Sequence, residues 1–513
     1  MLRTRYLAGF CGHRAHFSEE AVRPALAAAL KNLQQRAAET GGEIELYASA
    51  AEGTDVVCLE VARELHLPVH VLLPLVAGEF EKDFSTPAAW ARSKAQIDRA
   101  AMLPGRDSLR VVEGETTRPE CYFNQSMVML DAVDVLIAVW DGKPARGLGG
   151  TAEVVAQARA MGIPVLHILP LDGSATKDEG FDEAIERDAI LDELNDIAKA
   201  SEDVSGQEAA TSNELQRRLD EIAMSEAKKL RPSLVRIILI HGVAAILAAL
   251  VTFKVMDKEA LWEKYKWAIS LTELGLVSMA LWMNYRLRRR HVRDRWIRCR
   301  FACELVRGLR ASVPLVDPLH PATAWRDEEW HRFALSAGLL VQSDHTRAST
   351  KAQRDHYLST RLSETHPDGQ IRHYTEMSPG TLWWWSFTGK LGDWCAKLAP
   401  PFVLSSVLNK LSKIWHAPDG WELEYHFMTW LAVGFLPIAL PLTAGVAASL
   451  HHALDAGRRK QRYPQMVRAL RGIRSALEGL ETESTIRSAV VRSEDILQDE
   501  LREWRHAMSS SKR

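Results

Sequence analysis

Residues 135–153 read VLIAVWDGKPARGLGGTAE and join an apolar run, a glycine-rich loop and the start of an amphipathic stretch. The run Val135–Trp140 is continuously apolar, as expected of a strand that is buried on both faces. The stretch Glu153–Met161 that follows the loop has the periodicity of a helix. A strand, a glycine-rich turn and a helix in this order are typical of an α/β domain with a parallel sheet.

The same alternation extends over residues 5–171. Five further strand candidates are short apolar runs, namely Tyr6–Cys11, Ile44–Ala48, Val69–Leu73, Leu109–Val112 and Val165–Leu169. Amphipathic stretches separate them, among them Glu20–Ala38, Asp55–Leu65 and Cys121–Val133. The sequence therefore predicts a Rossmann-like α/β domain over residues 1–172, with helices on both faces of a parallel sheet. In such sheets, ligands bind beyond the carboxyl ends of the strands.

The rest of the chain is predicted to be helical. Residues 173–232 are polar and charged, which indicates a connector of exposed helices with a loop near residues 201–212. The run Leu234–Phe253 is long and apolar enough to cross a bilayer, and Trp267–Tyr285 follows after a short acidic loop. Basic residues flank both runs on their outer sides, which predicts a membrane hairpin over residues 233–285 with both ends in the cytoplasm.

A second membrane hairpin is predicted over residues 381–450. Its strong arm is Phe427–Leu450, which is followed by the basic cluster Arg458–Arg462. Its weak arm is Trp394–Trp415, which contains lysines and two prolines; the alternative is an interfacial helix anchored by Trp383–Trp385. The orientation rule favours the hairpin, because one span alone would leave the basic cluster outside. Residues 286–380 and 451–513 are then cytoplasmic helices, and the all-α region crosses the membrane four times.

Composition narrows the classes of function. The formal net charge is −2, and the basic cluster after Tyr285 is explained by topology and by anionic lipid, so we predict no nucleic-acid partner. The six cysteines are scattered without a CxxC pair, and the histidines lack ligand spacing, so we predict free thiols, no metal and no cofactor. No signal peptide opens the chain, so we expect the N-terminal domain to stay in the cytoplasm. Two hairpins would return the C-terminus to the same side, which predicts a multi-pass protein of the inner (cell) membrane with both termini in the cytoplasm.

Two loops after strands carry candidate ligand-binding residues. The first is Gly12-His13-Arg14, where glycine permits close approach and arginine suits a phosphate; the alternative is an ordinary turn. The second is Ser49–Asp55, which opens a helix and contains Glu52, Gly53 and Asp55. Its two acids suit a ribose hydroxyl or a base edge better than a bare phosphate, whereas the alternative is that Thr54 or Asp55 only caps the helix.

The third loop has the components of a phosphate cradle. Its candidate residues are Trp140, Asp141, Gly142, Gly149, Gly150, Thr151 and Glu153. The alternative is a flexible loop in which Thr151 caps the helix. The loop lacks the Lys-Ser/Thr ending of a P-loop, so triphosphate hydrolysis of that kind is not expected.

In combination, these motifs resemble the SLOG family, the Rossmann-like group that includes cytokinin-activating phosphoribohydrolases and DNA-uptake proteins of the DprA type. The resemblance covers residues 3–171. It rests on Gly149–Glu153 with Gly162–Val165, on Ala51–Asp55, and on Leu73-Pro74 with Glu79–Phe84. It implies a domain that binds a nucleotide or a nucleotide-derived molecule.

The membrane half resembles the SLATT family of helical effectors that accompany SLOG domains in prokaryotic conflict systems. Trp296-Ile297-Arg298 with Arg300 and Glu304 is similar to the helix after a hairpin in that family. Tyr357, Arg361-Leu362 and Gln370–Tyr374 are similar to the helix before a hairpin, and Glu494–Trp504 to a closing helix. The resemblance implies a receptor that senses a signal made during phage infection and permeabilises the membrane, which requires a homo-oligomer.

Two alternatives to a receptor remain open. Related hydrolases cleave a nucleoside monophosphate at the N-glycosidic bond, and Glu153 stands where their acidic residue is expected, with Arg146 or Arg159 as possible partners. The alternative function is therefore a membrane-tethered phosphoribohydrolase. The other alternative is a structural anchor, in which the spans only tether the domain; His241 and Glu273 inside the predicted spans are then packing residues.

Overall fold

The structure is a computed structural model. It describes residues 2–102, 107–112, 117–144, 147–199, 211–252, 259–316, 328–344, 349–377, 383–414, 432, 435–453 and 456–510. By its contacts the chain divides into two compact units. Unit 1 contains residues 1–222, 299–357 and 480–513, and unit 2 contains residues 223–298 and 358–479. We describe each unit by itself.

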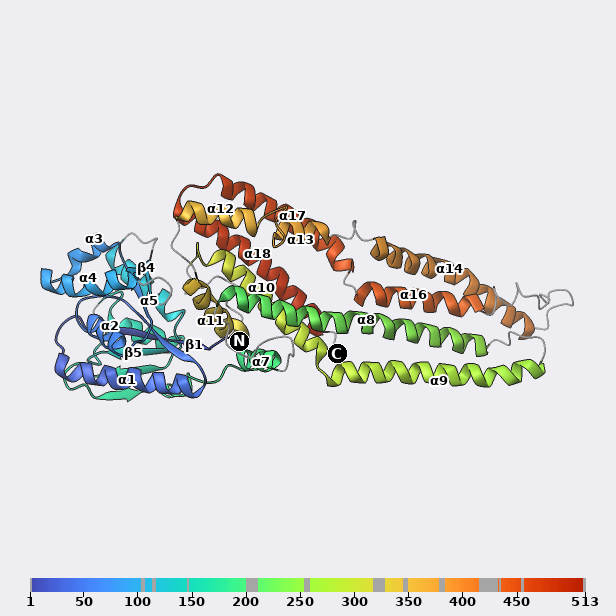
Figure 1. Ribbon diagram of the computed structural model, residues 1–513, viewed down its shortest axis with the longest axis horizontal. Helices are drawn as coiled ribbons and strands as arrows, with labels where there is room; N and C mark the ends of the chain where they lie inside the picture. The colour runs from blue at the N-terminus through green and yellow to red at the C-terminus, as the bar shows by residue number, and fades with distance from the viewer. Residues whose placement is uncertain are drawn as a thin grey trace. The chain divides into compact units, whose positions relative to one another are not determined.

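Unit 1 is built around a seven-stranded sheet (Figure 1). Its strands are β1 (Arg5–Gly12), β2 (Glu43–Ala48), β3 (Val69–Leu73), β4 (Ser108–Val111), β5 (Val135–Val139), β6 (Val165–Ile168) and β7 (Ala175–Lys177). The order in the sheet is β4-β3-β2-β1-β5-β6-β7, and all neighbours are parallel except β6 and β7. The predicted α/β fold and its six strands are confirmed, and the antiparallel edge strand β7 was not predicted.

Helices cover both faces of the sheet. The alternate strand residues Tyr6, Ala8 and Phe10 belong to a core that also contains side chains of α1 (Glu19–Glu39), α2 (Thr54–Glu64) and α4 (Pro87–Met102). The other face is covered by α5 (Arg118–Leu130) and α6 (Thr151–Ala160). This switch of face fits the topology, since the chain passes from the edge strand β4 back across to β5, beside β1.

Local signals fix where these helices begin. Ser18 caps α1 and accepts a hydrogen bond from the backbone N–H of Ala21. Thr117 and Glu120 form a capping box at the start of α5. A short helix, α3 (Ala77–Phe80), and a 3-10 turn, η1 (Glu81–Asp83), lie between β3 and α4, where the sequence indicated only a family resemblance.

The remainder of unit 1 is helical. It contains α7 (Ala189–Lys199), α11 (Glu328–Asp344), and parts of α8 (Ser212–Thr252), α10 (Val292–Ser312), α12 (Thr350–Thr360) and α18 (Glu483–Ser510). We predicted that the connector consists of exposed helices. Instead, α7 buries an apolar face that includes Leu191 and Leu194. The loop expected at residues 201–210 lies outside the described residues.

Helix α11 docks at the amino ends of β1 and β5. The backbone N–H of Arg5 donates to the buried Ser336 Oγ at 2.9 Å. The guanidinium of Arg332 lies 3.2 Å from the carboxylate of Asp134, the residue before β5, and 4.6 Å from the centre of the Tyr6 ring. At the far end of α11, Asp344 accepts a hydrogen bond of 2.5 Å from the N–H of Ser212, the first residue of α8.

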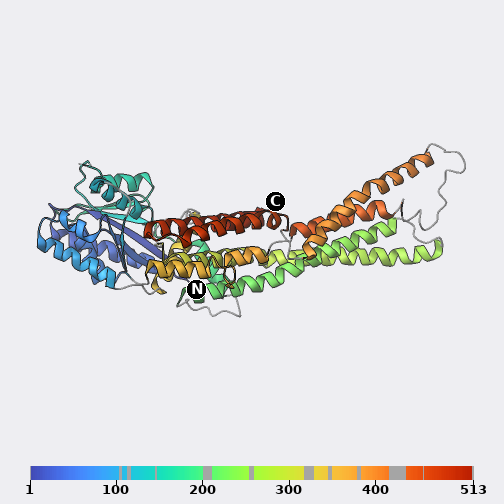
Figure 2. The same cartoon turned by 90° about the horizontal axis from the view of Figure 1, so that it is seen from above.

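Unit 2 contains the remaining parts of α8 and α10 with α9 (Glu259–Arg289), α13 (Gln370–Glu376), α14 (Trp383–Ile414), α16 (Leu436–Ala453) and α17 (Ala456–Glu478). Helix α14 packs along α16, and α13 packs against α17 (Figure 2). A Cβ atom on Gly242 of α8 would lie 2.9 Å from Val446 of α16, so these two helices approach closely.

One helix, α8, is long and apolar enough to cross a membrane, with a mean hydropathy of 1.7 in its most apolar window. This helix contains the predicted first arm, and α16 contains a shorter apolar stretch, Leu436–Leu450. Among the described residues no other helix meets the same criterion, so the four-span arrangement stays a prediction. The predicted weak arm lies mostly within α14, and the acidic loop between the arms of the first hairpin falls largely outside the described residues.

Candidate functional site

Two of the three predicted loops meet where the strand order reverses. The chain builds the sheet outward from β1 in one direction and then continues with β5 on the other side of β1. The carboxyl ends of β1 and β5 therefore frame the switch-point crevice at which such folds bind ligands. The N–H of His13 donates to the carbonyl of Val139 at 3.1 Å, and His13 Nε2 lies 3.6 Å from Asp141 Oδ1.

The second loop interlocks with the first. Thr54 donates to the carbonyl of His13 through both its N–H, at 3.1 Å, and its hydroxyl, at 3.0 Å. Gly53 has a φ of +100°, and a Cβ atom there would lie 2.5 Å from the carbonyl oxygen of Arg14. Position 53 therefore requires glycine, because its φ is positive and because a side chain would collide with the backbone of Arg14. The loop after β2 is a structural support of Gly12–Arg14.

Asp55 is buried at the junction of these loops, with 6% of its surface exposed. Backbone N–H groups of Gly12 and Ala51 donate to its carboxylate. Burial raises the pKa of Asp55 to about 8, although the nearby Arg14 opposes this rise. Asp55 is therefore mostly protonated at neutral pH and does not repel an anion. Neither it nor Thr54 caps α2, whose N-cap is Gly53 without a side-chain bond.

Glu52 is tethered to the loop before α4. Its carboxylate accepts hydrogen bonds from the backbone N–H of Ser85, at 2.8 Å, and from the Ser85 hydroxyl. No pattern in the sequence indicates this contact, because Ser85 follows a turn without periodicity. If Glu52 held a ribose hydroxyl, as predicted, its carboxylate would have to accept hydrogen bonds from that hydroxyl and from Ser85 at the same time.

A cluster that the sequence analysis missed surrounds Arg14. Its guanidinium lies over the ring of Tyr122, 4.8 Å from the ring centre. The Tyr122 hydroxyl donates to Asp83 at 2.7 Å, and Arg118 pairs with Asp83 at 2.9 Å. Burial raises the pKa of Tyr122, so its hydroxyl remains a donor at neutral pH. Residues of η1 and α5 thus hold Arg14, the cation predicted in the first loop, in position.

The glycine-rich loop forms a tight entry into α6. Gly149 has a φ of +77°, and a Cβ atom there would lie 2.9 Å from the backbone nitrogen of Phe123. Gly150 is the N-cap and Thr151 the first residue of the helix, so Thr151 does not cap it. The N–H of Gly149 donates to Glu153 Oε2 at 2.7 Å. Glu153 thus places a carboxylate at the anion-attracting end of the helix.

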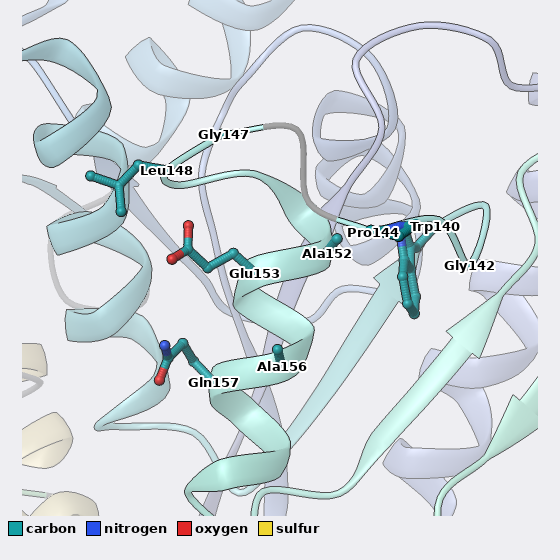
Figure 3. Close-up of a pocket in the computed structure, with 9 residues that line it drawn as sticks. All are labelled: Trp140, Gly142, Pro144, Gly147, Leu148, Ala152, Glu153, Ala156 and Gln157. Atoms are coloured by element: carbon teal, nitrogen blue, oxygen red, sulfur yellow. The ribbon is translucent and has the colours of Figure 1, made fainter.

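A pocket of about 710 Å³ opens beside this loop (Figure 3). It is lined by Trp140, Gly142, Pro144, Gly147, Leu148, Ala152, Glu153, Ala156 and Gln157. Figure 3 shows Trp140 and Gly142 on one side of the first turns of α6, and Glu153 and Gln157 on the other. The predicted residues thus form two adjoining groups, the pocket residues and the interlocked loops, which are joined through His13 and Asp141.

The arrangement bears on hydrolysis and on metal binding. Arg159, one possible partner of Glu153, pairs with Asp178 at 2.8 Å, and Arg146 lies outside the described residues. Within the described ranges, no group of three or more His, Cys, Asp or Glu side chains is placed to hold a metal ion. Comparisons of the chain with models of protein families, with curated proteins and with solved structures found no match.

Proposed function

We propose that this chain is a membrane-anchored receptor. Its α/β domain binds a nucleotide-derived signal, and its helices act on the bilayer as a SLATT-like effector that forms a pore or permeabilises the membrane in prokaryotic antiviral defence. The observation that carries the proposal is the position of the pocket, which lies beside the glycine-rich entry into α6, at the carboxyl end of β5, one of the two strands that flank the switch point of the sheet.

The pocket has the groups that a nucleotide requires. Helix α6 begins without a side-chain cap, so the first N–H groups of its backbone and its dipole favour a phosphate. Trp140 supplies a flat apolar wall on which a base can stack, and the tilted ring of His167 backs it at 5.2 Å. Arg14, held over Tyr122, adds positive charge at the neighbouring strand end. Asp55 is neutral at physiological pH and leaves this charge uncancelled.

The side chains of unit 2 support insertion of more helices than α8. The helices that contain the predicted spans, α8, α9, α14 and α16, bury small residues within those spans, namely Ala244, Ala280, Ala399, Ala439 and Ala447. The same helices expose large apolar residues, among them Leu239, Val243, Trp267, Leu271, Leu274, Leu281, Trp394, Leu404 and Leu408. Small residues at helix contacts and large apolar residues outside are the pattern of a membrane bundle. It favours the four-span, two-hairpin arrangement with cytoplasmic termini.

Helix α11 offers a route from the site to the membrane helices. It contacts β1 through Ser336 and reaches Asp134, at the start of β5, through Arg332. These are the two strands whose carboxyl ends frame the crevice. Through Asp344, α11 also binds the first peptide group of α8, which is the helix long enough to span a bilayer. A ligand that shifts β1 relative to β5 would therefore act on α8.

The test uses the full chain reconstituted in liposomes that hold a self-quenching dye. We expect one of AMP, cyclic ADP-ribose or a cyclic dinucleotide to raise the unfolding midpoint and to release dye. Trp140→Ala should abolish both effects, and Leu171→Ala, at an apolar position that is 72% exposed, should abolish neither. A chain that binds none of the three probes, or that binds one without any dye release, would overturn the receptor proposal.

The same samples distinguish the phosphoribohydrolase alternative, for which the position of Glu153 in the pocket is the supporting observation. Chromatography of the AMP incubation measures free adenine. Retention of intact AMP favours the receptor. Release of adenine that stops in Glu153→Gln favours the enzyme.

A further inference from the structure

Four arginines cluster at the end of α9, and we refer to them as the arginine collar. Arg286, Arg288 and Arg289 form its last turn, and Arg290 follows directly. All four are exposed, and within the described ranges of the chain they form no ion pair with a carboxylate. His291 then takes a φ of +49°, which ends the helix before α10 begins at Val292. The four positive charges are therefore held at one level of one helix.

The arginines point in different directions around the helix axis. Successive residues of an α-helix are rotated by about 100°, so Arg286, Arg288, Arg289 and Arg290 together span an arc of about 200°. A protein or a nucleic acid that docks on a helix contacts one side of it. Charges spread over more than half of the circumference at one level suit the headgroup layer in which a spanning helix is embedded.

Aromatic and apolar side chains precede the collar. Trp282 and Tyr285 are 56% and 60% exposed. The exposed Leu271, Leu274 and Leu281 precede them in the helix. The guanidinium of Arg286 stacks on Trp282, 5.3 Å from the ring centre. The order along α9 is therefore apolar, then aromatic, then positive, which is the order of the hydrocarbon, interface and headgroup layers of a bilayer.

We propose that this arginine collar, residues 286–290 with Trp282 and Tyr285, binds the anionic headgroups of the cytoplasmic leaflet. The inference rests on the proposed membrane function and names the lipid class that the helices prefer. A guanidinium donates two parallel hydrogen bonds to a phosphate, and the stacking on Trp282 holds one such fork at the level of the interface.

The experiment measures lipid retention by the full chain. The protein is purified in mild detergent, placed in nanodiscs of phosphatidylcholine with increasing phosphatidylglycerol, and analysed for the anionic lipid that remains bound. Replacing Arg286, Arg288, Arg289 and Arg290 with Gln should reduce the enrichment of phosphatidylglycerol at least tenfold, since each arginine contributes about fivefold. The matched Arg→Lys variant keeps the charge and should retain most of the enrichment.

A charge-matched control replaces four exposed cations of the α/β domain, Lys31, Lys82, Lys94 and Arg99, with Gln. It should leave the enrichment unchanged. Equal enrichment in the wild type and the Arg→Gln variant, or a preference of the collar for RNA over phosphatidylglycerol, would overturn the inference. Failure of the wild-type chain to float with liposomes would instead count against the proposed membrane function, so the two failures are distinguishable.

Discussion

The α/β domain and the predicted spans of unit 2 fill their interiors in opposite ways. The domain buries its largest side chains, such as Tyr6, Tyr47 and Phe10, and its glycines serve the loops. The predicted spans, which lie in α8, α9, α14 and α16, bury alanines and expose leucine and tryptophan. We infer that the size of the residues that a segment buries indicates whether the segment packs in water or in lipid. The apolar content of the segment indicates this less well. The following changes test this contrast.

The largest effect is expected for Gly53→Ala in the interlocked loops. The new Cβ would lie 2.5 Å from the carbonyl oxygen of Arg14, at a φ of +100°, so the backbone must move. We expect a loss of about 3–4 kcal/mol in the free energy of unfolding. Gly162→Ala is the control, since its φ is +77° and its Cβ would meet no atom within 4 Å; it should cost about 1 kcal/mol. Equal losses would show that the loops do not interlock.

The second effect concerns the buried acid of the same loops. Burial raises the pKa of Asp55 to about 8 in the folded chain, from 3.8 for an ordinary aspartate. Between these values the folded chain binds a proton that the unfolded chain lacks, so stability falls as the pH rises from about 4 to 8. Between about pH 5 and pH 7, the free energy of unfolding should fall by about 2–3 kcal/mol more in the wild type than in Asp55→Asn. Parallel unfolding midpoints of the two proteins over this range would contradict the burial of Asp55.

The third effect tests the interior of unit 2. Gly242→Leu would drive a side chain into Val446 of the neighbouring helix and should destabilise the chain in micelles by about 2 kcal/mol. Gly275→Leu makes the same chemical change on α9, where an added Cβ meets nothing within 4 Å. It should leave the unfolding midpoint unchanged or raise it. If both changes destabilise equally, the contrast between the two regions fails.

A smaller effect is expected for Arg332→Gln, which cuts the link from α11 to Asp134. Ligand should still raise the unfolding midpoint, but dye release should need about five- to thirtyfold more ligand, since coupling energies are about 1–2 kcal/mol. Arg36→Gln removes a comparable ion pair with Asp182, 3.3 Å away, and should leave the dose response unchanged. Dye release that is unaffected by Arg332→Gln would exclude α11 as the route.

The smallest effect is expected for Glu153→Gln. A neutral amide competes less for the N–H of Gly149 and repels a phosphate less, so AMP should bind about fivefold more tightly by calorimetry. Gln157→Glu adds a charge to the same side of the pocket and should weaken binding. Weaker binding by Glu153→Gln would mean that Glu153 contacts the ligand directly.

The sequence predicted the sheet to within about a residue at each strand, because strands buried on both faces form continuous apolar runs. It missed β7, which is short, exposed and polar. Periodicity also did not distinguish buried from exposed positions in the helices predicted to cross the membrane. When nearly all positions are apolar, only the packed structure separates the buried Ala280 from the exposed Leu281.

The sequence predicted the loops of the site but not the contacts that these loops make with distant residues. Glycines after strands are visible in a sequence, and these placed Gly12, Gly53 and Gly149 correctly at strand ends and a helix start. The engagement of Glu52 by Ser85 and the support of Arg14 by Tyr122 join segments that are far apart in the chain. No local pattern encodes such partners, and the same holds for Ser336, which lies 331 residues from Arg5.

The hydrogen bond from the N–H of Gly149 to Glu153 gives the pocket a resident competitor for an incoming anion. A tethered carboxylate acts at an effective concentration that free metabolites seldom reach. Abundant monocarboxylates in the cell therefore gain little by replacing it, since they offer the helix the same charge. A phosphate ester carries more charge and more acceptor oxygens, and so outcompetes it. A receptor of the proposed kind would thereby ignore common organic acids without any steric gate.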